Sequence, residues 1–190
     1  MRSLRSVDDI VAAAHAAVSA AGQLDKTYFV FTSDHGLHMG QFCLGPCKRQ
    51  PYETDIRIPM AIIGPGIPAG EVNFIAAIPD IAPTFVALAN ASAATALAAF
   101  DGRSFAHLVK SGGNSVASEG ASVGAAGWRD AQLIEYFATD SSMSPTPKAI
   151  AGHLKDMANN TFIGLRIINA TMNIVSCRPI CARAHACVDL

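Results

Sequence analysis

The chain has 190 residues, a formal net charge of −1 and 51% hydrophobic residues. This length suits one domain with a sizeable core, and the hydrophobic content excludes wholesale disorder. The near-zero charge gives no reason to expect nucleic acid or an anionic membrane as a partner, and no apolar run reaches the length of a membrane span.

The N-terminal part of the chain alternates helix and strand signals. A capping-box-like start at Ser6 predicts a first helix, and Gly22 is expected to end it. Residues 28–32 are aromatic and β-branched, which predicts a buried strand, and residues 58–63 predict a second one. Acidic residues follow the N-terminal arginines, so we expect no secretory signal sequence. The expected buried face of the first helix consists of Ile10, Val11, Ala14 and Val18.

The later part of the chain predicts more scaffold. We expect Asp80 to cap a helix, a short helix over 103–110, and strands over 133–137 and 162–168. The Gly-, Ser- and Ala-rich stretch 111–127 predicts a flexible surface insertion, and the two prolines within 139–148 predict a loop. The expected apolar face of the helix after Asp80 comprises Ile81, Phe85, Val86 and Leu88.

A group of chemically reactive side chains directly follows the first strand. In open α/β sheets, ligands bind beyond the carboxyl ends of strands. A carboxylate, imidazoles and an ammonium can hold a metal and stabilise an anionic ester. Taken singly, these residues have plainer explanations: an Asp near a Gly is often only a turn, and two histidines without a third ligand indicate zinc weakly. The group consists of Asp34, His35, His38 and Lys48.

The cysteines invite a second metal hypothesis. Cys43 and Cys47 form one Cys-x3-Cys pair, and Cys177 and Cys181 form another. The spacing is loose and the pairs lie far apart in sequence, so a disulfide or simple thiols are favoured over zinc.

Read together, the motifs resemble those of the sulfatase family, within the alkaline phosphatase-like superfamily. There is particular likeness to N-acetylglucosamine-6-sulfatases and arylsulfatases. The resemblance rests on Thr-Ser-Asp-His-Gly-Leu-His-Met-Gly-Gln at 32–41, Lys-Arg-Gln-Pro-Tyr-Glu-Thr-Asp-Ile-Arg-Ile-Pro at 48–59, and Gly-Pro-Gly-Ile at 64–67.

The resemblance implies a fold and an activity. The fold is α/β, an incomplete alkaline phosphatase-like sandwich with a central mixed sheet and part of a smaller C-terminal antiparallel sheet. A partial sulfatase domain would cover residues 1–175, and residues 176–190 would form a divergent tail. The activity is that of a sulfuric ester hydrolase, and the only partner implied is a sulfate ester of a sugar or an aryl alcohol. No oligomeric state follows.

The resemblance also implies residue roles. Asp34 and His35 match ligands of one divalent metal, which is Ca²⁺ in the family. His38 matches a histidine that helps the leaving oxygen depart, and Lys48 matches a lysine that binds a sulfate oxygen. His35 stands where many members have Asn, and an imidazole is a softer ligand than calcium prefers, so the identity of the metal is open.

The family's nucleophile has no counterpart in this sequence. Sulfatases use a formylglycine made within Cys-x-Pro-Ser-Arg, and Cys177-Arg178-Pro179 is only superficially similar. The family's upstream metal-binding Asp pair is also missing. We therefore expect a sulfatase fragment that carries the metal, His and Lys half of the site and is inactive alone. A non-catalytic remnant is the alternative, and a phosphate-ester hydrolase of the same superfamily is a weaker one.

The expected cellular destination also comes from the resemblance. The family is generally secretory or lysosomal in animals. Three glycosylation sequons, which begin at Asn90, Asn159 and Asn169, would suit that route, so a glycoprotein is expected.

Overall fold

The computed structural model describes residues 2–43, 46–91, 100–112, 127–137, 161–168 and 173–179. Most of the predicted insertion, the predicted loop at 139–148, the sequons at Asn159 and Asn169, and the chain beyond residue 179 lie outside these ranges. The helical elements are α1 (Arg2–Ala20), η1 (Leu24–Lys26), η2 (Gln41–Cys43), α2 (Glu53–Ile56), η3 (Ile78–Asp80), α3 (Ile81–Leu88) and α5 (Ala106–Lys110). The strands are β1 (Phe29–Thr32), β2 (Met60–Ile63), β3 (Ala131–Tyr136), β4 (Phe162–Ile168) and β5 (Asn173–Pro179).

The helix α1 ends as the sequence predicts but begins earlier. The amide of Gln23 donates to the carbonyl of Val18 at 3.1 Å, and Gly22 has a φ of 64°, which is the left-handed closure of a Schellman motif. The start at Ser6 was wrong, because the helix already begins at Arg2. Alanine, the best helix former, fills much of the turns after Ser6 and favours this continuous helix.

The expected buried face of α1 was also wrong. Ile10 is 67% exposed and Val11 is 50% exposed. The contact with the sheet comes late in the helix, where the ring of His15 lies 5.5 Å from the ring of Phe29. The 3.6-residue spacing of apolar residues therefore predicted the helix correctly but not which of its residues are buried. No helix among the described residues is long and apolar enough to cross a bilayer.

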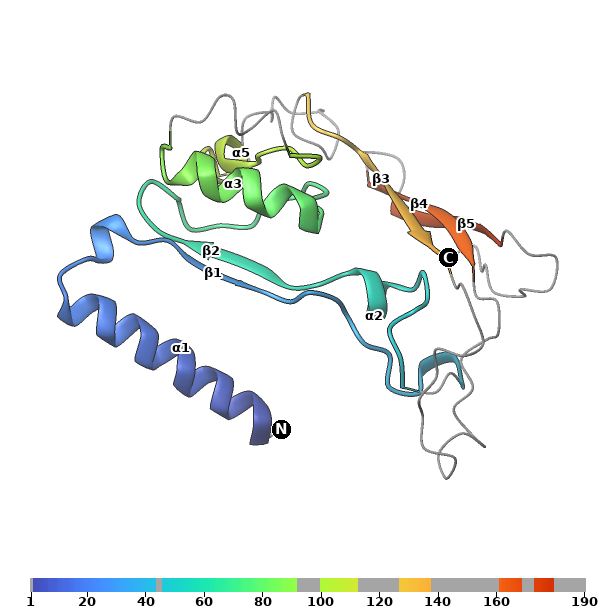
Figure 1. Ribbon diagram of the computed structural model, residues 1–190, viewed down its shortest axis with the longest axis horizontal. Helices are drawn as coiled ribbons and strands as arrows, with labels where there is room; N and C mark the ends of the chain where they lie inside the picture. The colour runs from blue at the N-terminus through green and yellow to red at the C-terminus, as the bar shows by residue number, and fades with distance from the viewer. Residues whose placement is uncertain are drawn as a thin grey trace.

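The predicted strands over 28–32 and 58–63 are confirmed as β1 and β2, but the expected burial of the first was wrong, because β1 contains no buried residue and Phe31 is 47% exposed. The two strands pair antiparallel, with Val30 opposite Ile62. Helix α1 lies on one side of this pair, and α3 and α5 lie on the other, which is an α/β arrangement (Figure 1). All strand pairs of the described residues are antiparallel, so the mixed sheet stays a prediction.

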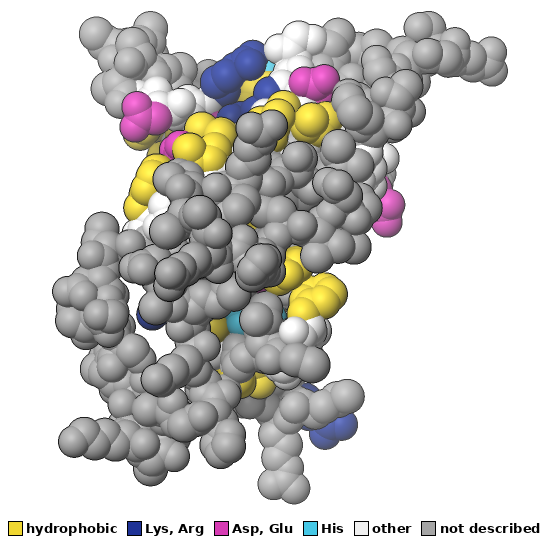
Figure 2. Space-filling model, turned by 90° about the vertical axis from the view of Figure 1, so that its right-hand side faces the viewer, with side chains coloured by type: hydrophobic (Ala, Val, Ile, Leu, Met, Phe, Trp, Pro, Cys, Tyr) yellow, Lys and Arg dark blue, Asp and Glu magenta, His cyan; other side chains and the backbone are white. Residues whose placement is uncertain are grey.

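The hydrophobic core lies between β2 and the segments around α5. The indole N–H of Trp128 donates to the carbonyl of Ile75 at 2.7 Å, which gives this ring a fixed place in the core. The guanidinium groups of Arg103 and Arg129 lie 4.8 and 5.0 Å from the same ring. Figure 2 shows Lys and Arg side chains gathered beside hydrophobic ones at the upper end of one face. The core cluster is Phe105, Leu108, Val109 and Trp128, against which Ile62, Ile67 and Phe74 pack.

Asp80 does not cap α3 as expected. Its backbone is in the right-handed helical conformation, because α3 continues directly from η3, and its side chain makes no cap hydrogen bond. The carboxylate is instead fully buried and accepts from the amides of Ala77 and Arg103, each at 2.8 Å. It also forms an ion pair with Arg129.

The buried face of α3 differs in part from the expected one. Leu88 is buried as expected, whereas Phe85 is 45% exposed. The helix uses Pro83 and Thr84 as its other buried residues. Thr84 is buried because its hydroxyl has hydrogen-bond partners inside the core, a reason that apolar periodicity does not detect.

The second sheet is antiparallel, with the strand order β3–β4–β5 (Figure 1). A C-terminal antiparallel sheet was expected, but among the described residues it is the larger sheet, with three strands against two. β4 has the predicted bounds, and β3 begins at Ala131 rather than 133. β5 was not predicted, and the expected start of the divergent tail at residue 176 falls inside it. Cys177, in the motif that superficially resembles the formylglycine sequence, is a strand residue opposite Gly164.

Candidate active site

The loop after β1 carries the candidate site. Asp34 to His38 follow the carboxyl end of the strand, as the sequence predicts. The short helix α2 lies next to this loop, where the chain leads toward β2 (Figure 1). The loop after β1 supplies Asp34, His35 and His38, and the segment before α2 supplies Lys48.

Three of the predicted residues meet at one exposed point. The Nε2 atom of His35 lies 3.3 Å from a carboxylate oxygen of Asp34, and the ammonium of Lys48 contacts the same nitrogen. The other ring nitrogen, Nδ1, lies 2.7 Å from the carbonyl of Gly36. Because a carbonyl only accepts, Nδ1 carries the proton, which leaves the lone pair of Nε2 available to an ammonium or a cation. The side chain of Asp34 is 83% exposed, so this point faces solvent.

His38, the fourth predicted residue, lies beneath the surface. It is only 1% exposed, and its Nδ1–H donates to the two carboxylate oxygens of Asp55 at 2.7 and 2.8 Å. Asp55 is also buried and accepts from the amide of Gln50 at 2.9 Å and the hydroxyl of Thr54 at 3.1 Å. A buried ring–carboxylate contact with further hydrogen bonds holds its members in fixed positions.

The backbone of His38 brings Lys48 to the site. The amide of His38 donates to the carbonyl of Cys47 at 3.0 Å, and the amide of Cys47 donates back to His38 at 3.2 Å. This isolated antiparallel bridge fixes the residue that precedes Lys48. The thirteen-residue separation between His35 and Lys48 is therefore closed by local backbone pairing.

Gly36 lets α2 pack directly against the loop. Its amide donates to the carbonyl of Asp55 at 2.8 Å. A Cβ atom at this position would lie 2.0 Å from the carbonyl oxygen of Thr54, so no side chain fits there. On either side of His38, Leu37 and Met39 are 49% and 67% exposed. Buried and exposed positions thus alternate along this part of the loop.

The sequence did not assign a role to Asp55, Glu53 or Arg166. The carboxylate of Glu53 accepts from Nε of Arg166 at 2.7 Å. Glu53 and Asp55 lie within the motif that carries the resemblance, but motif spacing does not reveal a contact. Arg166 is 113 residues away from Glu53, and no local pattern signals so distant a contact.

The metal hypothesis stays a prediction, because the described residues contain no complete metal-binding group. Asp34 and His35 provide two converging donors, which fits part of a divalent-metal site. Calcium takes about six to eight oxygen ligands, so further donors are needed. Within the part of the chain that the structure describes, no three His, Cys, Asp or Glu side chains gather in one place. Of the four cysteines of the zinc hypothesis, this finding covers Cys47, because the side chains of Cys43, Cys177 and Cys181 are not described.

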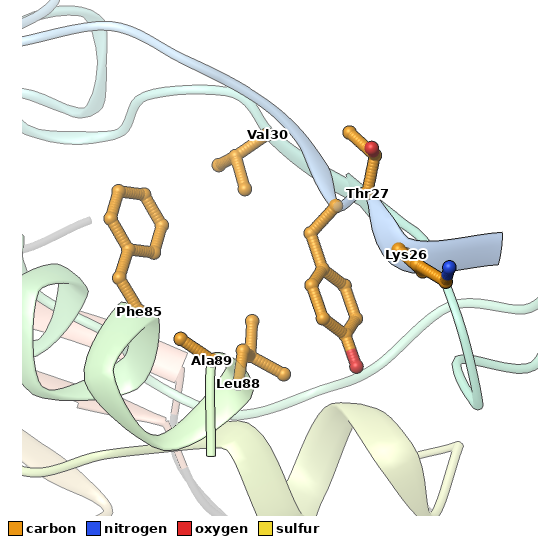
Figure 3. A pocket seen from close by; sticks show the side chains of 7 residues that line it. Lys26, Thr27, Val30, Phe85, Leu88 and Ala89 are labelled. Atoms are coloured by element: carbon orange, nitrogen blue, oxygen red, sulfur yellow. The ribbon is translucent and has the colours of Figure 1, made fainter. Parts of the chain in front are cut away.

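A separate cavity of about 610 Å³ lies at the other end of β1. Figure 3 shows Phe85 and Leu88 of α3, and Ala89 just after it, on one side of the cavity, facing Val30 of β1. None of the residues that line it belongs to the loop of Asp34 and His38. The cavity is therefore distinct from the candidate site.

Comparisons with known proteins indicate one family. A family model described as Sulfatase matches residues 1–91. The chain is 39% identical over 136 residues to an extracellular sulfatase SULF-1 homolog of Drosophila melanogaster. The aligned region covers 71% of the chain and 11% of that protein. It is also 30% identical over 187 residues to the N-acetylglucosamine-6-sulfatase of Bos taurus, and this aligned region covers 93% of the chain and 31% of that protein. An arylsulfatase of Volvox carteri is 34% identical over 122 residues, which is 62% of the chain and 19% of that protein. The chain thus spans less than a third of the length of these relatives.

Proposed function

Because the chain belongs to the sulfatase family, we propose that it contributes part of the active site of a sulfuric ester hydrolase. The observation that carries this proposal is the convergence of Lys48, His35 and Asp34 at one solvent-facing point after β1. We also propose that the two sheets belong to an alkaline phosphatase-like sandwich, whose central sheet would be mixed.

The chemistry of a sulfate ester explains the residue types. Hydrolysis breaks the bond between sulfur and the alcohol oxygen, and negative charge develops on that oxygen until it receives a proton. The ammonium of Lys48 would bind an oxygen of the anionic sulfate group. Asp34 and His35 would hold one divalent cation, Ca²⁺ by family resemblance, together with donors outside the described residues. Such a cation, when bound, supplies electrostatic stabilisation of the developing charge.

We propose a positioning role for His38. A general acid must come within about 3 Å of the proton's acceptor, directly or through one water. The 1% exposure of His38 and its bonds to Asp55 favour holding the loop over contact with substrate. The leaving-group role that the family resemblance implies stays a prediction, and it requires the ring to become accessible in a complete site.

The proposed substrate class is a sulfated sugar or an aryl sulfate. It comes from the names of the similar proteins, among them the N-acetylglucosamine-6-sulfatase and the arylsulfatase, and from Lys48, which suits any sulfate monoester. The substrate's organic part would be chosen by residues near the exposed point. Leu37 and Met39 are the exposed hydrophobic residues beside it.

The proposal predicts that the chain binds sulfate through Lys48 but does not turn over a sulfate ester alone. The reason is that no formylglycine precursor provides a covalent nucleophile, and the ligand set for calcium is incomplete. The purified chain would be assayed with an aryl sulfate in the presence of calcium, and its dissociation constant for inorganic sulfate would be measured. We expect Lys48→Ala to weaken sulfate binding about tenfold, because one charge-assisted contact is lost.

The matched control is Lys26→Ala, an exposed lysine at the distant cavity, which should leave sulfate binding unchanged. Hydrolysis above background that Lys48→Ala abolishes would overturn the expected inactivity. A chain that binds no sulfate would favour the non-catalytic remnant. Turnover of an aryl phosphate instead of the aryl sulfate would favour a phosphate-ester hydrolase.

We further propose a secreted or lysosomal destination for this glycoprotein. One similar protein is described as extracellular, and Asn90 of the first sequon is exposed just after α3. Expression through a secretory pathway should therefore attach a glycan at Asn90. A mass decrease after glycosidase treatment, absent in Asn90→Gln, would be the expected result, and an unchanged mass would contradict glycosylation at Asn90.

A further inference from the structure

The residue Arg166 connects the C-terminal sheet to the candidate site. Its Nε donates to Glu53 at 2.7 Å, while its other nitrogens donate to the carbonyl of Ile167 at 2.8 Å and to the side chain of Asn173 at 2.6 Å. The side chain is only 14% exposed. The guanidinium is thus anchored to β4 and β5 and presents one N–H to α2.

The helix α2 depends on such outside contacts. It has four residues, and a helix of one turn is not stable by itself. Its two acidic residues make contacts in different directions. Glu53 contacts the C-terminal sheet, and Asp55, two residues later, binds the ring of His38 and the amide of Gln50.

The placement of α2 in turn determines the placement of the loop. The backbone of α2 lies directly against Gly36, which has no room for a Cβ atom and donates to the carbonyl of Asp55. The carbonyl of Gly36 receives the Nδ1–H of His35, which orients the ring that meets Lys48. A continuous set of contacts therefore runs from β4 through α2 to the exposed point of the site.

We propose that Arg166 is a positioning residue, which holds the loop of Asp34 and His35 in its binding geometry through Glu53 and α2. This inference rests on the proposed function only in its consequence for sulfate binding. It differs from a general stabilising role, because it places the effect of Arg166 in α2 and the loop rather than in the core around Leu108.

The structure offers a matched control within the same helix region. Arg57 also faces Glu53, but at 3.8 Å and with a side chain that is 79% exposed. Exposed pairs of this kind contribute little. Arg166→Met and Arg57→Met remove the same charge from the surroundings of the same carboxylate, and only the first removes the link to the sheet. Glu53 is 36% exposed, so water can solvate it in both variants.

The first measurement is amide hydrogen exchange followed residue by residue. We expect the amides of Gly36 and Gln50, which both depend on Asp55, to exchange about tenfold faster in Arg166→Met, because α2 opens locally. The amide of Leu108 in the core should not change. Arg57→Met should leave all of these rates within about twofold of the original chain. Equal acceleration at Leu108, or none at Gly36 and Gln50, would overturn the proposal.

A second variant tests whether Arg166 acts on α2 through its contact with Glu53. Glu53→Gln should accelerate the same two amides as Arg166→Met. If the two residues act through one contact, the double variant should exchange no faster than either single variant. Effects that multiply in the double variant would overturn the pathway through Glu53. Arg166→Lys, which keeps the charge, should recover part of the protection.

The last measurement tests whether the placement of the loop affects the affinity for sulfate. The dissociation constant for inorganic sulfate should rise about fivefold in Arg166→Met and stay unchanged in Arg57→Met, because only the first disturbs the geometry around Lys48. Unchanged affinity in Arg166→Met would overturn the positioning role. If the original chain binds no sulfate, the proposed function fails, while the exchange rates still decide whether Arg166 holds the loop.

Discussion

The carboxylate of Asp55 joins three parts of the chain within a few ångströms. It receives hydrogen bonds from the ring of His38, the amide of Gln50 and the hydroxyl of Thr54. Both ring and carboxylate are nearly fully buried, so water cannot replace a lost partner. The stability of the loop therefore depends in part on this acceptor.

We predict that Asp55→Asn lowers the free energy of unfolding by about 2–4 kcal/mol. The amide NH2 group of Asn cannot accept a hydrogen bond, so the ring of His38 or the amide of Gln50 is left without its buried acceptor. Unfolding in urea measures the change.

Asp101→Asn is the matched control, because Asp101 is exposed and the chemical change is the same. Its effect should stay below about 0.5 kcal/mol. Similar losses in both variants would show that the buried contacts of Asp55 do not matter for folding.

At the scale of elements, α3 and α5 are joined through a buried hydroxyl. Thr84 is 0% exposed, its hydroxyl donates to the carbonyl of Asp80 at 2.6 Å, and it accepts from the amide of Phe105 at 3.1 Å. Phe105 begins the segment that carries the core cluster. One side chain thus connects the start of α3 to the hydrophobic core.

Thr84→Val should destabilise the chain by about 1–3 kcal/mol. Valine has nearly the same shape, so the effect reports the unsatisfied amide of Phe105 rather than a cavity. For a chain of this size, each kcal/mol corresponds to a fall in the melting temperature of about 2–4 °C, which calorimetry would detect.

Thr27→Val provides the comparison, because its hydroxyl donates to the carbonyl of Gln23 at an exposed site. Water replaces that bond, so the melting temperature should fall by less than in Thr84→Val. An equal or larger fall in Thr27→Val would refute the role assigned to Thr84.

Over the whole molecule, local patterns predicted β1, β2 and β4 and the end of α1, because apolar runs and Gly22 act within a few residues. Burial and long-range contacts were not predictable in this way. Asp80 follows a helix-capping pattern, yet its carboxylate is used by Arg103 and Arg129, which lie 23 and 49 residues away. β5 escaped prediction because its Cys, Arg and Pro residues are not typical of a strand, and pairing with β4 accounts for it.

The candidate site shows the same division. The motif named Asp34, His35 and Lys48, and the structure brings these three together. It also named His38, but only the fold reveals that Asp55 binds this ring from below. Glu53 and Arg166 are distant in sequence, so their contact depends on how the second sheet meets α2.

The alternation along the loop has a consequence for how this protein can diverge. Gly36 and His38 are constrained by α2, whereas the side chains of Leu37 and Met39, which follow each of them, are exposed to solvent. Mutation at 36 or 38 would disturb the support of Asp34, His35 and Lys48, while mutation at 37 or 39 would change only the exposed surface of the loop. Positions 37 and 39 can therefore change from hydrophobic to polar or charged without weakening the contacts of Gly36 and His38. Under the proposed function, new preferences for the organic part of a sulfate ester can arise at these two positions while Gly36 and His38 stay fixed.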